Sequence, residues 1–96
     1  MGAVATAIDN KLRAQFAPAR LSIEDESSKH HGHSGWREGG ETHFKVEIVS
    51  AAFDGQTRVA RQRLVYAALK DEFAAGLHAL ALTTLTPSEE AKRPQR

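Results

Sequence analysis

Four of the five histidines in this chain fall within one short segment, residues 26–44, which is rich in glycine and serine. Three of them are His30, His31 and His33, and His43 lies near the end of the segment. The fifth histidine is His78. Neutral imidazole is the commonest metal ligand in proteins, so this grouping indicates a metal site. The alternative is a polar loop that binds metal only casually.

The chain contains no cysteine. This excludes disulfide bonds, and it excludes any metal or iron–sulfur site whose thiolate ligands come from this chain. Imidazoles without thiolates or carboxylates make an incomplete site for most tightly held metals. If the histidines hold a metal, another molecule must therefore supply further ligands.

The hydrophobic pattern predicts the elements that position these histidines. Apolar residues at every fourth position predict a helix over residues 3–16, which Pro18 ends. Alternating apolar residues predict strands over 21–26 and 42–50, joined by the long loop that carries most of the histidines. Loops of this length in compact domains are usually functional or disordered.

A second helix is predicted over residues 58–76, after a turn in which a short extra helix would also fit. Residues 77–85 predict a third strand that is apolar on both faces, which is typical of a central or covered strand. The expected apolar face of the second helix consists of Val59, Gln62, Tyr66, Leu69 and Phe73, and Leu64, Val65 and Ala68 widen it.

This order of elements predicts an α+β domain in which two helices cover one face of a three-stranded mixed sheet. The first two strands should pair antiparallel, whereas the helical crossover makes the second and third strands parallel. Parallel strands begin at the same end of a sheet, so His43 and His78, at the starts of these strands, should meet there. The loop that carries the other three histidines leads into the same end, and we expect all five to gather there.

Several residues allow other interpretations. His78 alone would more often be a hydrogen-bonded structural residue than a ligand. Arg58, Arg61 and Arg63 form a basic helix stripe, which indicates either nucleic-acid contact or a solvated surface with ion pairs. Trp36, an aromatic residue in a polar loop, either packs locally or belongs to a partner surface. The net charge of +1 is too small to argue for nucleic acid by itself.

The sequence predicts no catalytic activity of its own, because it shows no Ser/His/Asp set, cysteine nucleophile or phosphate-binding loop. No apolar run approaches the roughly 18 residues that a membrane span requires. The N-terminus lacks the charged start and apolar centre of a secretory signal. We therefore expect a cytoplasmic protein that does not associate with membranes.

Five motifs, in order and at consistent spacing, together resemble one protein family over about residues 7–87. They are DES-x-x-H (Asp25 to His30), E-T-H-F-K-V (Glu41 to Val46), V-S-x-x-F-x-G (Val49 to Gly55), R-x-R-x-V-Y-x-x-L (Arg61 to Leu69) and H-A-L-A-L (His78 to Leu82). On these motifs the chain resembles the BolA family. One departure is Gln62, where BolA proteins often have histidine, at a position that the family does not use for ligation. We expect a BolA-like domain over residues 1–87 and a mobile polar tail over 88–96.

The resemblance implies a fold like class II KH domains and a monothiol glutaredoxin as partner. BolA-like proteins share a 2Fe-2S cluster with the glutaredoxin and glutathione, and no cluster is expected to bind tightly to the isolated chain. The family ligand in the HAL motif matches His78, and the loop ligand matches His30 best, with His31 and His33 as alternatives. The implied role is that of an adaptor in iron–sulfur cluster trafficking or in iron or redox sensing, with a free form that is a monomer or a weak dimer.

Some BolA-like proteins are described as transcriptional regulators, including in stress responses, so DNA binding is the alternative function. The KH-like fold and the basic helix stripe support it. KH domains clamp the nucleic-acid backbone with a GxxG loop. One GxxG spacing, Gly32 to Gly35, occurs in this sequence, inside the histidine-rich segment.

Overall fold

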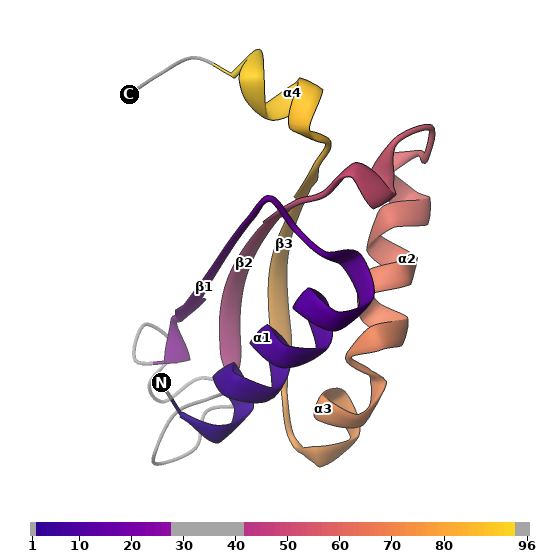
Figure 1. Cartoon of the computed structure of the whole chain (residues 1–96). Coiled ribbons are helices and arrows are strands. Elements are labelled where there is room, and N and C mark those ends of the chain that lie inside the picture. Colours follow the sequence, from indigo (N-terminus) through magenta and orange to yellow (C-terminus); the bar gives the residue numbers. More distant parts are fainter. Residues whose placement is uncertain (1, 28–41, 94–96) are drawn as a thin grey trace.

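The computed structural model describes residues 2–27 and 42–93 (Figure 1). A short 3-10 helix, η2, lies between β2 and α2, in the turn where a short extra helix was expected. In chain order the elements are α1 (Ala3–Phe16), β1 (Arg20–Asp25), β2 (His43–Val49), η2 (Ala51–Phe53), α2 (Arg58–Ala68), α3 (Lys70–Ala75), β3 (Ala79–Leu85) and α4 (Pro87–Ala91).

The three strands form one mixed sheet in the order β1-β2-β3. β1 and β2 pair antiparallel, with Leu21 opposite Ile48, and β2 and β3 pair parallel, with His43 opposite Ala79. The predicted α+β topology is confirmed, while the likeness to class II KH domains stays a prediction. As a result, the end of β1 and the starts of β2 and β3 lie at the same end of the sheet (Figure 1).

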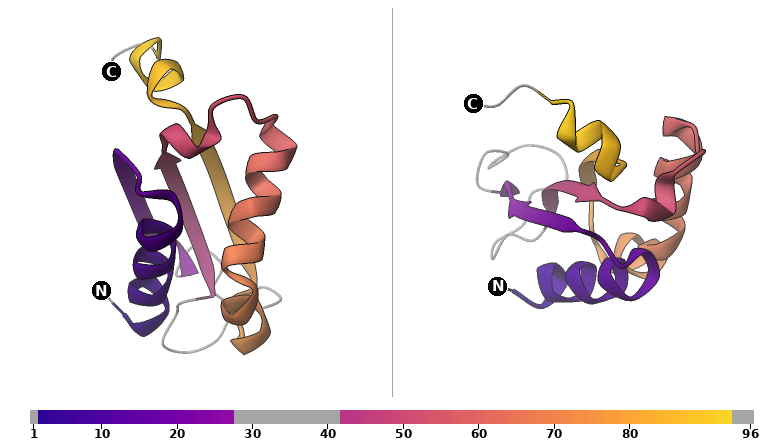
Figure 2. Two further views of the ribbon diagram at one scale, coloured as in Figure 1. Left: turned by 45° about the vertical axis from the view of Figure 1, so that its right-hand side comes forward. Right: turned by 45° about the horizontal axis from the view of Figure 1, so that its top comes forward.

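The hydrophobic core lies between the sheet and the helices α1, α2 and α3, which share one of its faces (Figure 2). α1 contributes the side chains that were expected from its four-residue period, because Ile8 and Leu12 are fully buried and Phe16 nearly so. Alternate residues of β2 point into the same core. The other fully buried apolar side chains of the core are Phe44, Val46, Ile48, Phe53, Val65 and Leu69.

The position of β3 differs from the prediction, because β3 is an edge strand and not a central one. Its alternation is that of a strand with one covered face: Leu80 and Leu82 pack against the core, whereas Ala81 and Thr83 are exposed. The exposed side chains of β3, Ala81 and Thr83, are small, and this mimics the pattern of a strand that is buried on both faces. The prediction of a central strand is therefore wrong, whereas the core does cover one face of β3.

The buried face of α2 also differs from the prediction. Arg61 and Val65 are its buried residues, whereas Val59 and Tyr66 are 56% and 41% exposed. Val65 and Leu69 are fully buried, as the pattern predicts, so the prediction fails only in part. It is wrong for Val59 and Tyr66, which are exposed, and it overlooked the burial of Arg61. Tyr66 still contacts the ring of Phe73, at a centroid distance of 5.5 Å.

The predicted second helix is in fact two helices, α2 and α3, that meet at Leu69. Leu69 leaves helical geometry, with φ −103° and ψ 15°, while its side chain stays fully buried. α3 is tied to α1 by Lys11, whose Nζ lies 2.9 Å from Glu72 and 3.6 Å from Asp71. The change of axis at Leu69 therefore lets the acidic first turn of α3 reach a basic residue of α1.

A further helix, α4, follows β3 and extends into the region for which the sequence predicts a mobile polar tail. Thr86 and Glu89 form a capping box at its start, and Pro87 occupies its first turn. The sequence interpretation overlooked this helix, and the mobility expected of the tail stays a prediction. None of the helices in the described residues combines the length and apolar character that crossing a membrane requires.

Candidate functional site

Two histidines far apart in the sequence meet where β2 and β3 begin. The rings of His43 and His78 have centroids 5.1 Å apart and are tilted by 52°. Their predicted meeting is confirmed. His30, His31, His33 and Trp36 lie outside the described residues, so their place at this end of the sheet stays a prediction.

The two rings differ in their access to solvent. His78 is exposed, whereas His43 is 6% exposed and counts among the buried polar residues. The prediction that His43 contributes to a partner surface is therefore wrong, because a ring this enclosed offers almost no area for contact. His78 remains available to a ligand that approaches from outside.

Thr42 holds both histidines in place. Its carbonyl oxygen accepts hydrogen bonds from the backbone N–H groups of His78 at 2.8 Å and Ala79 at 3.1 Å. Its side-chain Oγ1 lies 2.9 Å from Nδ1 of His43. Thr42 therefore fixes the backbone of His78 and the ring of His43.

Ser27 ties the end of β1 to the start of β2. Its buried Oγ accepts hydrogen bonds from the backbone N–H of Thr42 at 2.9 Å and of His43 at 3.2 Å. The backbone N–H of Glu26 donates to the carbonyl of His43 at 2.7 Å. Sequence reasoning missed the supporting roles of Ser27 and Thr42. The available signal was that each is a hydroxyl residue in a motif that flanks the histidine-rich segment.

The donor chemistry of this site is that of imidazole nitrogen. The described residues contain no group of three or more histidine, cysteine or carboxylate side chains that could hold a metal ion by themselves. The chain has no thiol. The site therefore suits a ligand that is shared with a second molecule, and it does not suit a metal ion that the described residues would enclose alone.

Arg61, a predicted surface residue, is 6% exposed and bonds within the fold. Its Nε donates to the carbonyl oxygen of Gln56 at 2.9 Å, and Nη1 donates to that of Thr84 at 3.3 Å. Its guanidinium also pairs with both carboxylate oxygens of Glu89, at 2.7 and 3.2 Å. The prediction that Arg61 belongs to an exposed nucleic-acid surface is wrong, and its role is structural.

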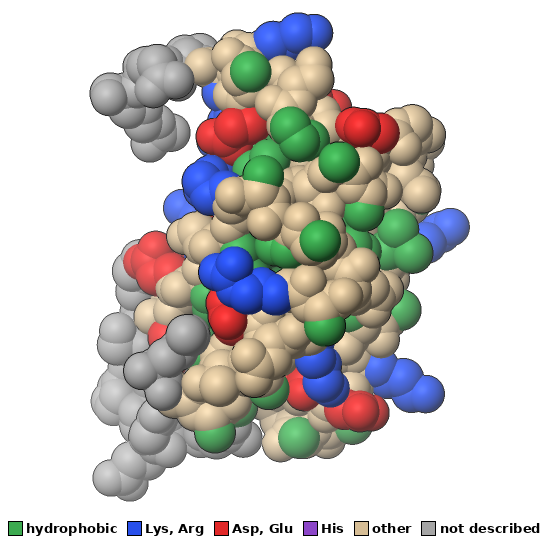
Figure 3. Space-filling model, viewed as in Figure 1, with side chains coloured by type: hydrophobic (Ala, Val, Ile, Leu, Met, Phe, Trp, Pro, Cys, Tyr) green, Lys and Arg blue, Asp and Glu red, His purple; other side chains and the backbone are tan. Residues whose placement is uncertain are grey.

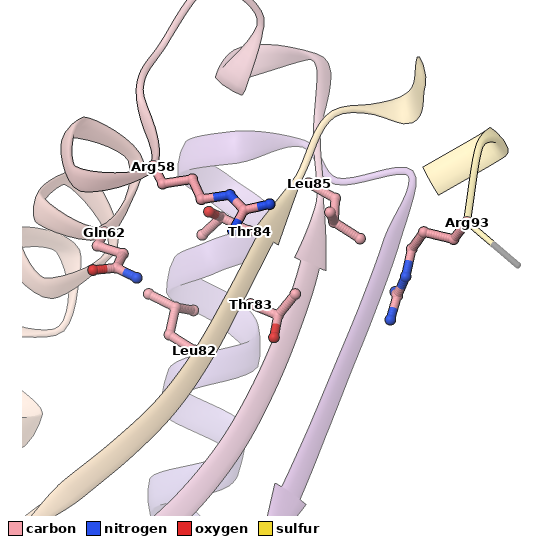
Figure 4. A pocket seen from close by; sticks show the side chains of 7 residues that line it. All are labelled: Arg58, Gln62, Leu82, Thr83, Thr84, Leu85 and Arg93. Atoms are coloured by element: carbon pink, nitrogen blue, oxygen red, sulfur yellow. The ribbon is translucent and has the colours of Figure 1, made fainter. Parts of the chain in front are cut away.

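Arg58 and Arg63 are exposed, as the basic stripe requires. A hollow of about 340 Å³ lies beside Arg58, between α2 and the outer edge of β3. Figure 4 shows Arg58 and Gln62 projecting from α2 toward β3, with Arg93 approaching from the chain after α4. The remaining lining residues are Leu82, Thr83, Thr84 and Leu85.

The charges near this hollow are largely balanced. Arg93 pairs with Glu47 at 3.1 Å and with Glu90 at 4.0 Å. Arg58 forms no ion pair within residues 2–27 and 42–93, so it is the uncompensated cation at the hollow. On the face shown in Figure 3, Lys and Arg side chains are scattered among acidic ones and do not gather into one patch.

Comparison with known proteins agrees with this fold. The family model for BolA-like protein matches residues 12–89. Protein BOLA1, chloroplastic, from Arabidopsis thaliana is 45% identical over 91 residues, which cover 93% of this chain and 57% of the relative. The DNA-binding transcriptional regulator BolA from Escherichia coli is 43% identical over 82 residues, which cover 85% of this chain and 74% of the relative.

A solved structure, the BolA domain of SufE1 from Arabidopsis thaliana, is 44% identical and superposes with a TM-score of 0.84, over 93% of this chain and 98% of that one. This chain spans little more than half of chloroplastic BOLA1, and 25% of SufE-like protein 1, chloroplastic/mitochondrial, from the same plant. With a family model that matches most of its length and relatives of this similarity, the chain belongs to the BolA-like family.

Proposed function

We propose that this BolA-like chain is a non-enzymatic adaptor that binds a monothiol glutaredoxin and shares a 2Fe-2S cluster with it. The observation that carries the proposal is the exposed His78, whose backbone is fixed by Thr42 at the end of the sheet where β2 and β3 begin. The second nitrogen ligand is a histidine of residues 28–41. His30 has the best match to the family motif, and His31 and His33 are the alternatives.

The absence of cysteine explains why the site needs a partner. The glutaredoxin cysteine and a glutathione thiolate would supply the sulfur ligands, and this chain would supply nitrogen. Two thiolates and two imidazoles resemble the ligand set of Rieske centres. Because imidazole must be deprotonated to bind iron, cluster sharing should weaken as the pH falls. Such a releasable cluster suits trafficking or sensing better than permanent electron transfer.

The test is a titration of this protein into a cluster-loaded monothiol glutaredoxin with glutathione, followed by visible circular dichroism and size-exclusion chromatography. We expect the cluster spectrum to change and a heterodimer to form. The His78→Ala variant should fail to produce the changed spectrum, while Lys45→Ala, an exposed β2 residue on the same sheet, should behave as the wild type. An unchanged spectrum with the wild-type chain would refute shared ligation.

DNA binding is the second candidate function. The Escherichia coli relative carries it in its name, and in this chain the hollow beside the uncompensated Arg58 offers a place for a phosphate group. We expect Arg58→Ala to weaken binding to duplex DNA and to lower its salt dependence, with His78→Ala as the matched control that leaves both unchanged. Binding that does not depend on salt, or that survives Arg58→Ala, would refute this candidate.

A cytoplasmic location remains part of the proposal. Two relatives from Arabidopsis thaliana are described as chloroplastic and as chloroplastic/mitochondrial. Fractionation of the cells that make this protein, with detection by a specific antibody, would decide the location. Recovery in an organelle fraction would overturn the cytoplasmic assignment and leave the proposed ligation chemistry untouched.

A further inference from the structure

The buried His43 has no role in the ligation proposed above, yet its ring lies directly against the proposed ligand. Its centroid is 5.1 Å from that of His78, within the range of attractive contacts between aromatic rings. Because it is only 6% exposed, the ring has almost no surface with which to reach a cluster held between two proteins. Its position calls for a function other than direct ligation.

The ring of His43 is anchored on several sides. Nδ1 lies 2.9 Å from Oγ1 of Thr42, and the backbone N–H donates to Oγ of Ser27 at 3.2 Å. His43 also belongs to the central strand β2. Its carbonyl oxygen accepts a hydrogen bond from the backbone N–H of Glu26, and the residue lies opposite Ala79 of β3. A side chain held in this way is a rigid surface for whatever packs against it.

His78, in contrast, is anchored through its backbone. Its N–H donates to the carbonyl of Thr42, and the preceding residue, Leu77, is 4% exposed. Its side chain is exposed, and an exposed histidine ring normally samples several rotamers. The contact with His43 is the one ring contact to His78 within residues 2–27 and 42–93.

We propose that His43 is a positioning residue that holds the His78 ring in the orientation needed for cluster ligation, an inference that rests on the function proposed above. An oriented ligand loses less conformational freedom when it binds, and this raises the affinity of the assembled site. For one side chain the expected gain is roughly 2- to 10-fold in the stability of the shared-cluster complex. His43 itself supplies no bond to iron.

The first measurement concerns the free protein and needs no cluster. Side-chain NMR couplings and ring relaxation report the rotamers and motion of His78. We expect one dominant rotamer in the wild type and averaging among several in His43→Leu, while His43→Phe keeps the dominant rotamer. Both variants lose the contact with Oγ1 of Thr42, and both place an apolar side chain in the site. They differ mainly in that phenylalanine has a flat ring and leucine does not.

The second measurement repeats the cluster titration with the same two variants. His43→Leu should weaken the shared-cluster complex by roughly 2- to 10-fold, and His43→Phe should retain wild-type stability. Amide spectra and melting curves of both variants confirm that the fold is intact. If His43→Leu fails to fold, the comparison of His43→Phe with the wild type is still decisive. It shows whether His43 acts through its flat ring or through its imidazole nitrogen as a ligand.

Three results would overturn the inference. They are an averaged His78 ring in the wild type, a His43→Leu variant that matches the wild type, and a His43→Phe variant that loses the cluster although its fold is intact. The last would make the imidazole nitrogen of His43 itself essential. If the wild-type chain forms no shared cluster at all, the proposed function fails, whereas the rotamer comparison still decides whether His43 orients His78.

Discussion

Arg61 and Glu89 form a two-point ion pair that joins α2 to the short helix α4. Nη1 lies 2.7 Å from Oε1, and Nη2 lies 3.2 Å from Oε2. Oε1 also accepts a hydrogen bond from the backbone N–H of Thr86 at 2.9 Å. The carboxylate thus completes the capping box of α4 while it neutralises an arginine that is almost wholly buried.

We predict that this pair makes stability depend on pH in the acid range. The hydrogen bond from Arg61, followed by that from Thr86, lowers the pKa of Glu89 from 4.5 to about 2. Because the folded pKa is lowered, the stabilisation is present above about pH 4.5 and is lost as the pH falls toward 2.

Urea unfolding of the wild type and Glu89→Gln between pH 2 and 6 tests this, because the variant lacks the titrating group. The difference in unfolding free energy should shrink through that window as the pH is lowered. Asp54→Asn, an exposed position in the turn after η2, is the control for a general effect of lost charge. If the difference in unfolding free energy between the wild type and Glu89→Gln is the same at pH 2 and at pH 6, the prediction is contradicted.

We predict that Arg61→Ala destabilises the fold. The substitution leaves the carbonyl oxygens of Gln56 and Thr84 without their guanidinium donor, at a cost of about 1–3 kcal/mol. Arg63→Ala, on the exposed side of the same helix, should change stability by less than about 0.5 kcal/mol. Chemical denaturation of both variants provides the measurement, and equal stabilities would show that Arg61 is dispensable. Loss of DNA binding by Arg61→Ala would accordingly reflect the fold and not a lost phosphate contact.

We predict that His78→Ala separates ligation from stability. The side chain is exposed, so its removal should change the unfolding free energy by less than about 0.5 kcal/mol, while cluster sharing is lost. Among the other histidines, His30→Ala should weaken cluster sharing. If His30→Ala has no effect and His33→Ala weakens cluster sharing, the second ligand is His33 and not His30. Melting temperature and visible circular dichroism of each variant in complex with the glutaredoxin separate these outcomes.

We predict that Ser27→Ala loosens the end of the sheet where the histidines meet. Its Oγ is the acceptor for the backbone N–H groups of Thr42 and His43, both buried, and losing it should cost about 1–3 kcal/mol. Hydrogen exchange at these two amides should accelerate, while exchange at Ile48, further along the same strand, stays slow. Ser22→Ala, an exposed serine of β1, is the control and should leave all three unchanged.

The meeting of His43 and His78 could be predicted from the sequence because it depends only on element order. A helical crossover makes two strands parallel, and parallel strands begin at one end of a sheet, whatever their side chains do. The burial of His43 could not be predicted in this way. It depends on the hydrogen bonds that His43 makes with Ser27 and Thr42, which become visible only when the strands are in register.

The burial of Arg61 escaped prediction for a related reason. Helical periodicity selects apolar side chains for the core, and Val59 and Tyr66 fit that pattern better than an arginine does. Arg61 can be buried because Glu89, a residue of the helix that follows β3, neutralises it. The sequence predicts a polar tail where that helix forms, so nothing in the sequence marks Glu89 as the partner of a buried arginine. The break at Leu69 was equally hidden, because no glycine or proline marks it.

The hydrogen bond from the backbone of Thr42 to the side chain of Ser27 fixes the two points between which residues 28–41 are inserted. The sheet therefore does not depend on how many residues lie between them, and doubling their number would cost only about 0.6 kcal/mol in closure entropy. Under the proposed function, a segment with a cysteine in place of its histidines would give the same scaffold a thiolate in place of an imidazole ligand.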